Sequence, residues 1–357
     1  MGPAPAPSGR GSGVQRVLLA SPRGFCAGVE MAIKALSWMV RVFEPPVYCY
    51  HEIVHNRVVV DRFRALGVVF VADIAEVPAG APLMLSAHGT APEVLVEARA
   101  RGGVVIDAVC PLVTKVHHEV KVRAGKGYTV IYVGHVGHDE AVGTVAVAPE
   151  AVRLVQDEDD VAGLDLDAAT PVALLAQTTL SQHDWQGVLD EARARFPGLW
   201  MPGRSDLCFA TTNRQDALQA IAPRSDAVVV IGSPNSSNTV ALVKTATTAG
   251  CARVLRVNSV DELPDDLTGV VGVTAGASAP EALVRAVLER LAPVDGIEEV
   301  AVTDEDEYFP PPAELRQLLR GILAGLSAGL GGPIAPGPLL ADDRDLPAAD
   351  VLASLGG

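Results

Sequence analysis

Short apolar runs alternate with helical patterns along most of the chain. From Val14 onward, a run of Val, Leu, Ile and Ala is repeatedly followed by Gly and small polar residues, and then by a helical periodicity. Short runs of β-branched and aliphatic residues are typical of buried strands, and the periodic segments are typical of helices. This repetition of strand, loop and helix predicts an α/β fold with mainly parallel sheets.

Nine of the apolar runs lead into clusters of residues that can do chemistry. They occupy residues 17–28, 47–56, 83–90, 104–111, 130–140, 172–181, 206–215, 228–238 and 271–280. Ligands of open parallel sheets bind beyond the carboxyl ends of the strands, where loops and helix N-termini converge. We therefore expect all nine clusters to face one common cavity.

Composition and charge narrow the class of protein. Hydrophobic residues make up 49% of the 357 residues but aromatics only 4%, so the core should consist mainly of aliphatic side chains. The formal net charge of -15 speaks against a nucleic-acid partner. The chain has no uninterrupted apolar run long enough for a membrane span, and its start lacks the apolar core of a signal peptide. We expect a cytoplasmic monomer.

The spacing of three cysteines predicts the domain organisation. Cys26, Cys110 and Cys208 are separated by about one small domain each. We predict three α/β domains of roughly equal size, between a disordered tail and a partly disordered C-terminal extension. The predicted ranges are 1–13 for the tail, 14–109, 110–207 and 208–302 for the domains, and 303–357 for the extension. A helix over residues 313–330 is expected in the extension, with the remainder of the tail mobile. The part after about residue 310 is expected to be dispensable for chemistry.

The same three cysteines are candidate metal ligands. They lie in SPRGFCAGVE, DAVCPLVTK and DLCFATTNRQ, each at a predicted strand end, whereas Cys49 and Cys251 do not. Three thiolates can hold a 4Fe-4S cluster with one iron free of protein ligands, or a zinc ion with an open position. Soft sulfur ligands suit both metals, so the cysteines alone leave the choice open.

His51 to His55 form a literal HExxH sequence, the signature of zinc metallopeptidases. That motif requires a helix, because only there do the two histidines share one face. Here the strand-like VYCY precedes it and β-branched residues crowd it. We therefore interpret His51 as a structural histidine and set the peptidase hypothesis aside.

Polar residues in the remaining clusters suit an anionic ligand. His55, His88 and His138 lie at strand ends, where protonated imidazoles can pair with phosphate oxygens. Further candidates precede helical patterns, where hydroxyls and backbone N–H groups cap a helix and can also bind phosphate: Ser236, Ser237, Asn238 and Ser278. Glu140 is the candidate general acid, and Thr178 could relay a proton or hold a substrate oxygen.

Taken in order, these motifs resemble those of the 4-hydroxy-3-methylbut-2-enyl diphosphate reductase family, which ends the non-mevalonate isoprenoid route. The resemblance runs from about residue 17 to about residue 302. It is carried by SPRGFCAGVE, HEIVHN, SAHG, CPLVTKVH, GHVGHDE, QTTLS, CFATTNRQ, GSPNSSN and TAGASAP. Phe209 stands where the family often has Tyr, and Pro234 where a Lys is common.

The resemblance implies three pseudo-symmetric domains around a 4Fe-4S cluster held by Cys26, Cys110 and Cys208, with the substrate hydroxyl on the fourth iron. It implies reductive dehydroxylation to isopentenyl and dimethylallyl diphosphate, with electrons from a ferredoxin or flavodoxin. Diphosphate-binding residues of the family map onto His55, His88, His138, Ser236, Ser237, Asn238 and Ser278. The proton source maps onto Glu140, and Thr178 falls near the substrate hydroxyl.

Two other functions fit the residues considered by themselves. A zinc-dependent hydrolase with Cys and His ligands is one, and a sensor that binds a diphosphate or a metal without turnover is the other. Iron and sulfide content separates the reductase from the hydrolase, and turnover with a strong reductant separates it from the sensor.

Overall fold

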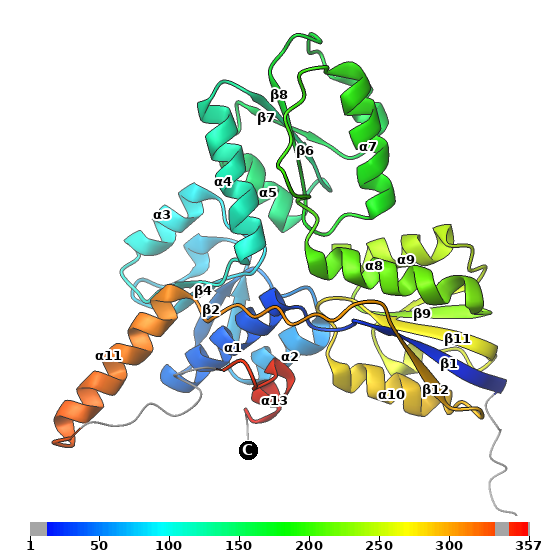
Figure 1. The fold of residues 1–357 in the computed structure, drawn as a ribbon. Helices are drawn as coiled ribbons and strands as arrows, with labels where there is room; N and C mark the ends of the chain where they lie inside the picture. Colours follow the sequence, from blue (N-terminus) through cyan, green and yellow to red (C-terminus); the bar gives the residue numbers. More distant parts are fainter. Residues whose placement is uncertain (1–12, 333–342, 356–357) are drawn as a thin grey trace, which may run out of the picture.

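The computed structural model describes residues 13–332 and 343–355, and it contains three parallel sheets. Figure 1 shows them as three lobes around a common centre. The fold is thus the α/β arrangement of parallel sheets that the sequence predicts. Among the described residues, no helix is both long and apolar enough to cross a membrane.

The four-stranded sheet has the order β3-β2-β4-β5. Its strands are β2 (Val47–Tyr50), β3 (Val68–Val71), β4 (Leu83–Leu85) and β5 (Val105–Asp107). The elements around it are α1 (Ala27–Val42), α2 (Arg57–Ala65), η1 (Ile74–Glu76) and α3 (Pro92–Ala100). Ile33, Leu36 and Met39 of α1 are fully buried against this sheet, so α1 belongs to this lobe.

The three-stranded sheet has the order β7-β6-β8. Its strands are β6 (Thr129–Val133), β7 (Val152–Val155) and β8 (Val172–Ala176). Its helices are α4 (Pro111–Gly125), α5 (Asp139–Ala146), α6 (Glu158–Gly163) and α7 (Gln182–Arg195). Every residue of β8 is buried, as expected for a strand with helices on both of its faces.

The five-stranded sheet has the order β10-β9-β11-β1-β12. Its strands are β1 (Gly13–Ser21), β9 (Ala227–Ile231), β10 (Val254–Val257), β11 (Thr268–Ala275) and β12 (Ile297–Ala301). Its helical elements are α8 (Phe209–Ile221), η2 (Ala222–Arg224), α9 (Ser237–Thr248), η3 (Val260–Glu262) and α10 (Glu281–Leu291). Strand β1 pairs with both β11 and β12, although it lies within the range predicted for the first domain.

The chain passes from one sheet to the next at each of the three cysteines. Cys26 lies between β1 of the five-stranded sheet and α1 of the four-stranded lobe, and Cys110 lies between β5 and α4. Cys208 follows the buried Leu207 of the three-stranded lobe and precedes α8 of the five-stranded lobe. The expected ranges 14–109, 110–207 and 208–302 stay a prediction, except that β1 belongs with the sheet of the last range.

The segment before Cys208 differs from the prediction. No strand precedes this cysteine directly, because residues 201–208 have no regular structure and the nearest preceding element is α7. The strand-like pattern of the DLCF segment instead reflects burial: Asp206 and Leu207 are buried, and Leu207 packs in the core of the three-stranded lobe. Residues 1–12, 333–342 and 356–357, including most of the tail predicted to be disordered, lie outside the described residues.

The described part of the C-terminal extension packs on the body. Helix α11 (Ala313–Gly329) buries Leu315 and Leu319 in the core of the four-stranded lobe. Helix α13 (Ala348–Ala353) packs against α1 and contributes Leu352 to the same core. The expected helix is therefore present, but the expectation of a mobile remainder is wrong for residues 343–355. Their apolar side chains complete a core, which the Pro- and Gly-rich composition of the tail did not reveal.

Polar contacts fix α13 as well. The buried Lys34 of α1 donates from Nζ to the Asp343 carbonyl oxygen at 3.0 Å. The Ala348 N–H donates to Glu30 Oε2 at 2.6 Å, which satisfies one of the free N–H groups at the start of α13. Because α1 begins directly after Cys26, the extension braces a helix that positions a candidate ligand.

Replacing Leu319 by Ala is expected to lower the free energy of unfolding by about 2–5 kcal/mol, because it opens a cavity in the core. Leu326→Ala is the matched control on the same helix: Leu326 is 53% exposed, so its loss should change stability by no more than about 0.5 kcal/mol. Urea unfolding measures both. Equal, small effects would show that α11 does not dock in solution.

Candidate active site

One cavity lies where the three lobes meet, and all the residues predicted to form the site line it. From the four-stranded lobe and its junctions come Cys26, His55, His88 and Cys110. From the three-stranded lobe come His138, Glu140 and Thr178. From the five-stranded lobe and its junction come Cys208, Ser236, Ser237, Asn238 and Ser278. The structure therefore brings the predicted residues together in one cavity.

The three cysteines occupy equivalent places, each as the residue before the first turn of a helix. Cys26 precedes α1, Cys110 precedes α4 and Cys208 precedes α8. Each backbone N–H donates to a carbonyl oxygen of another loop at the cavity, those of Ala277, Ala87 and Thr178, at 3.0–3.1 Å. The positive ends of three helix dipoles consequently point towards the sulfur atoms, where they favour negative charge.

Gly28 allows two of the thiols to approach each other. A Cβ atom at this position would lie 2.9 Å from Cys110 Sγ and 3.9 Å from Cys26 Sγ. Any larger residue at position 28 would therefore displace the Cys110 thiol. The third cysteine is held by Thr211: Cys208 Sγ lies 3.0 Å from Thr211 Oγ1 and accepts a hydrogen bond from the Thr211 N–H at 3.2 Å.

Burial makes these thiols hard to ionise without a cation. It raises the pKa values of Cys26 and Cys110 above the usual range, and it raises the pKa of Cys208 to about 12. The neighbouring thiols add to the increase for Cys110 and Cys208. Three converging thiolates are stable only beside positive charge, which a metal centre supplies. The donor set and the dipoles therefore fit a metal held by sulfur.

Glu140 lies in the first turn of α5 with its side chain directed at Thr178. It is only 2% exposed, and its two carboxylate oxygens accept from the Thr178 N–H at 2.7 Å and the Thr178 hydroxyl at 2.9 Å. Burial raises the pKa of Glu140 to about 7, against the opposing effect of these hydrogen bonds. A carboxyl group with this pKa can hold a proton near neutral pH and release it to a substrate.

Three histidines form a packed group at one end of the cavity. The rings of His55 and His88 are stacked with centroids 3.9 Å apart, and His138 contacts His55 edge-on at 5.3 Å. Burial, reinforced by the neighbouring imidazoles, lowers the pKa of His88 well below its usual range and lowers that of His138 to about 4. Without a ligand, these two side chains are neutral at pH 7. The expected protonated form requires an anion to raise their pKa.

His138 has its donor atom fixed by the backbone. The Glu140 N–H donates to His138 Nδ1 at 3.2 Å, so the neutral ring carries its proton on Nε2. Other polar atoms of the site are buried without a hydrogen-bond partner among the described residues: His55 Nε2, His88 Nδ1 and Asn238 Nδ2. Buried polar groups without partners are costly, so a polar ligand that pairs with them gains affinity.

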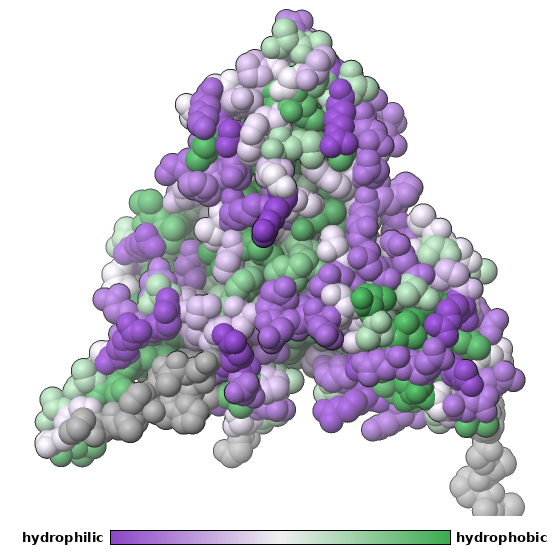
Figure 2. Space-filling view, in the orientation of Figure 1, coloured by the Kyte–Doolittle hydropathy of each residue, from purple (hydrophilic) through white to green (hydrophobic). Residues whose placement is uncertain are grey.

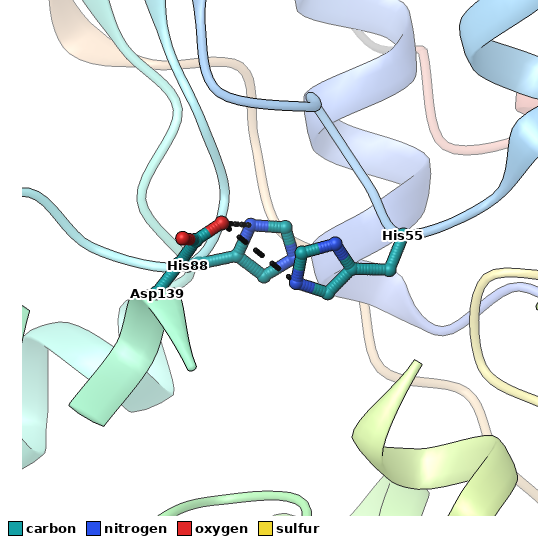
Figure 3. A group of neighbouring side chains, drawn as sticks. All are labelled: His55, His88 and Asp139. Carbon is teal, nitrogen blue, oxygen red and sulfur yellow. Dashed lines mark ion pairs between the residues drawn. The ribbon is translucent and has the colours of Figure 1, made fainter. Parts of the chain in front are cut away.

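Asp139 is a residue of this site that the sequence analysis did not single out. Its Oδ2 atom lies 3.8 Å from both His55 Nε2 and His88 Nδ1. Figure 3 marks these two ion pairs with dashed lines. These three groups have the composition of a metal site, with ligand atoms within 4.8 Å of one another. However, the two rings are inclined by only 13°, and the lone pair of an imidazole nitrogen lies in the ring plane. Two stacked rings cannot direct both lone pairs at one ion, so these three side chains do not fit a shared metal ion.

His51 is held in place by Asp139, with 2.7 Å between His51 Nδ1 and Asp139 Oδ1. Its φ of 58° is rare for a residue other than Gly. This hydrogen bond raises the pKa of His51. Residues 51–55 do not form a helix, so the geometry required for a metallopeptidase HExxH motif is absent from this segment. The interpretation of His51 as a structural histidine agrees with these contacts.

The serine and asparagine side chains line the remaining wall. Ser236 caps α9 by accepting from the Thr239 N–H at 3.3 Å, and Ser237 Oγ accepts from Thr179 Oγ1 at 2.9 Å. Asn238 Oδ1 accepts from the Ala277 N–H at 2.9 Å, which leaves its Nδ2 group free to donate. Ser278 donates to the His55 carbonyl oxygen at 3.0 Å. Capping and ligand binding thus coexist at the start of α9.

Phe309 completes the lining from a segment where no site residue was expected. It follows β12 and lines the cavity. Its ring meets that of Phe209 edge-on, with 6.5 Å between the ring centroids. The same segment is tied down by Glu305, which accepts from the buried Arg214 at 3.0 Å. The only signal in the sequence is an aromatic pair, Tyr308 and Phe309, in an otherwise acidic and Pro-rich stretch.

Comparison with known proteins gives a consistent set of relatives. Residues 17–292 match the family described as LytB protein. The 4-hydroxy-3-methylbut-2-enyl diphosphate reductase of Rhodopirellula baltica is 47% identical over 308 residues, which cover 84% of this chain and 96% of the relative. Reductase 1 of the same name from Mycobacterium bovis is 47% identical over 307 residues, covering 85% and 92%.

Solved structures agree with these relatives. The structure of the E-1-hydroxy-2-methyl-but-2-enyl-4-diphosphate reductase from Plasmodium falciparum superposes with a TM-score of 0.83 at 30% identity. The superposition covers 87% of this chain and 99% of that one.

Proposed function

Because the chain belongs to the LytB protein family and is a 4-hydroxy-3-methylbut-2-enyl diphosphate reductase, we propose that its central cavity binds this diphosphate beside a 4Fe-4S cluster. Cys26, Cys110 and Cys208 would hold the cluster. The observation that carries the proposal is the convergence of three helix-capping cysteines on the cavity that the histidines, Glu140 and Thr178 also line. Three protein sulfurs leave one iron of such a cluster without a protein ligand.

When bound, the cluster supplies the electrons and the Lewis-acid assistance for breaking the C–O bond. The reaction takes up two electrons and two protons, and it releases water as the hydroxyl group is replaced by hydrogen. The products are isopentenyl and dimethylallyl diphosphate. The side chains have three tasks: to bind the diphosphate, to keep water out and to deliver protons.

The diphosphate would occupy the end of the cavity lined by the histidines and α9. His138 Nε2 and Asn238 Nδ2 are the donors whose orientation the backbone contacts fix. The N-terminus of α9, begun by Ser236 and Ser237, adds backbone N–H groups and a favourable dipole. Phe209 and Phe309, which also line the cavity, would limit the access of water to the reacting carbons.

Glu140 would deliver a proton to the substrate, with Thr178 as its partner. The Thr178 hydroxyl now donates to Glu140, and its oxygen can accept a hydrogen bond from the substrate hydroxyl at the same time. A proton held by Glu140 could then pass directly, or along this hydroxyl, to the departing oxygen or the allylic carbon. The backbone bond from the Thr178 N–H keeps the carboxyl group oriented throughout.

The assay is turnover under strictly anaerobic conditions with a small artificial reductant. We expect the hydroxylated diphosphate to be converted into both isoprenoid diphosphates. Binding of the substrate without conversion, in protein that contains its full metal content, would contradict the proposal and favour the sensor. A cytoplasmic location, a monomeric state and a ferredoxin or flavodoxin as the donor are parts of the same proposal.

Diphosphate binding is expected to take up protons. The pKa of His138 is about 4 in the free site, and an adjacent phosphate anion raises it, so the bound state holds more protons. Affinity should therefore rise as pH falls from 8 towards 5. His138→Asn should reduce the uptake and weaken binding by about 1.5–3 kcal/mol, as for loss of a charge-assisted hydrogen bond.

Titration calorimetry with inorganic diphosphate, in two buffers of different ionisation enthalpy, measures the proton uptake. Protons that the diphosphate itself gains or loses on binding contribute equally in both proteins. The difference in proton uptake between the parent and His138→Asn therefore reports on His138 alone. Identical uptake in both proteins would show that His138 stays neutral in the complex. His118→Asn is the control, because His118 is exposed on α4 and is not among the residues that line the cavity.

A further inference from the structure

The surface along α4 differs in charge from the rest of the molecule. The chain has five lysines, and three of them, Lys115, Lys121 and Lys126, lie on α4 or at its end. The net charge of the whole chain is -15, so this concentration is a local reversal of sign. Helix α4 begins directly after Cys110, so the reversal starts at the cysteine centre.

The solvent-facing side of α4 carries no carboxylate. Its exposed residues recur at helical spacing: Pro111, Thr114, His118, Lys121 and Gly125. The one acidic residue of the helix, Glu119, lies on the flank and pairs with Arg123 at 3.4 Å. Figure 2 shows hydrophilic side chains over α4 on this face of the molecule.

A second cysteine segment joins the same surface. Lys115 Nζ lies 3.2 Å from Asp206 Oδ1 and donates to the Ser205 carbonyl oxygen at 3.4 Å, so the loop before Cys208 lies against α4. Arg204 in this loop is exposed. Within residues 13–332 and 343–355, no carboxylate pairs with Arg204, Lys121 or Lys126. We call Lys115, Lys121, Lys126 and Arg204 the basic stripe.

The stripe leads outward from the candidate cluster. At 1.5 Å per residue, Lys115 lies about 7.5 Å and Lys121 about 16 Å along the helix axis from Cys110. On the other side of the cysteines the exposed charges are acidic: Asp304, Asp306 and Glu307 flank the Glu305 that binds Arg214 of α8. Charge therefore changes sign across the cysteine centre, which would orient a charged partner as well as attract it.

The reaction requires two electrons from outside, and no side chain of the cavity supplies them. Resting on the proposed function, we infer that the basic stripe is the docking surface for a small acidic electron-transfer protein, which passes its electrons to the centre from the side of Cys110 and Cys208. An acidic surface of the donor pairs with the stripe, and the acidic segment 304–307 repels it from the α8 side. Electrostatic pairing of this kind mainly increases the association rate and weakens with salt.

The test is a charge reversal of two exposed stripe residues, Lys121→Glu with Arg204→Glu, neither of which lines the cavity. The matched control is Arg256→Glu with Arg285→Glu, which makes the same change in net charge on the exposed surface of the five-stranded lobe. Each variant is assayed as the cluster-containing enzyme, once with a small chemical reductant and once with a purified acidic ferredoxin kept reduced.

We expect equal turnover of all three proteins with the small reductant. With ferredoxin as the donor, the stripe variant should need a roughly tenfold higher ferredoxin concentration to reach half-maximal turnover. Its ferredoxin-dependent turnover should also respond much less to added salt, while the control variant should resemble the parent in both respects. Unchanged ferredoxin dependence of the stripe variant, or an equal loss in the control, would overturn the inference. Failure of the parent with the small reductant would instead contradict the proposed function itself.

Discussion

Replacement of Cys26, Cys110 or Cys208 by Ser is expected to cause loss of most of the iron and to lower turnover by roughly 10²-fold or more. Loss of a group that merely orients a metal ligand costs about 10–100-fold, and loss of a ligand costs at least as much. A serine hydroxyl is a poor substitute, because it is a hard donor that does not ionise near neutral pH. Each cysteine also opens a helix whose dipole is directed at the centre, so no other thiol can take its place.

Cys49 and Cys251 provide the controls, since both are buried in apolar cores away from the cavity. Ala is the suitable replacement for Cys49, because a serine hydroxyl would be buried there without a partner. These variants should keep iron and activity, with at most a loss of stability. Loss of iron from either one, or full iron and activity in a serine variant of the three site cysteines, would contradict the assignment.

Glu140→Gln is expected to reduce turnover by roughly 10²–10⁴-fold while substrate affinity changes far less. Gln keeps the size of the side chain and can still accept from the Thr178 N–H, but it has no acidic proton to give. In the parent, turnover should also fall as pH rises through about 7, because the general acid is then deprotonated. The Gln variant should lack that decline.

The readouts are iron content, diphosphate affinity and a pH profile of turnover. Glu119→Gln is the control for removal of a carboxylate outside the cavity, and it should leave all three unchanged. A Glu140→Gln enzyme with normal iron content and binding, and a rate within a few-fold of the parent, would show that the proton comes from elsewhere. Thr178 or the diphosphate of the substrate would then be the next candidates.

The site could be predicted from the sequence because its residues follow buried strands or open helices. His88 follows β4 closely and Ser236 caps α9, and such positions converge in parallel α/β folds whatever the details of strand pairing. Asp139 was passed over because nothing in GHVGHDE distinguishes it from its neighbours. Its importance comes from contact with His51, His55 and His88, which lie far from it in the sequence.

Local sequence patterns do not predict which strands pair or how distant segments of the chain dock on the body. Strand β1 has the same buried aliphatic character whether it pairs with β2 or with β11, and only the path of the chain at Cys26 decides between them. Phe309 and α13 belong to a segment whose Pro and Gly content resembles that of a flexible tail. They are ordered by contacts with Phe209 and α1, which composition does not encode.

Metal and acid-labile sulfide content of protein purified without oxygen tests the central claim most directly. We expect brown protein with broad visible absorption and about four iron and four sulfide per chain, all of them lost in the Cys110→Ser variant. Colourless protein that contains stoichiometric zinc and no sulfide would contradict the account and favour a zinc-dependent hydrolase at the same three cysteines.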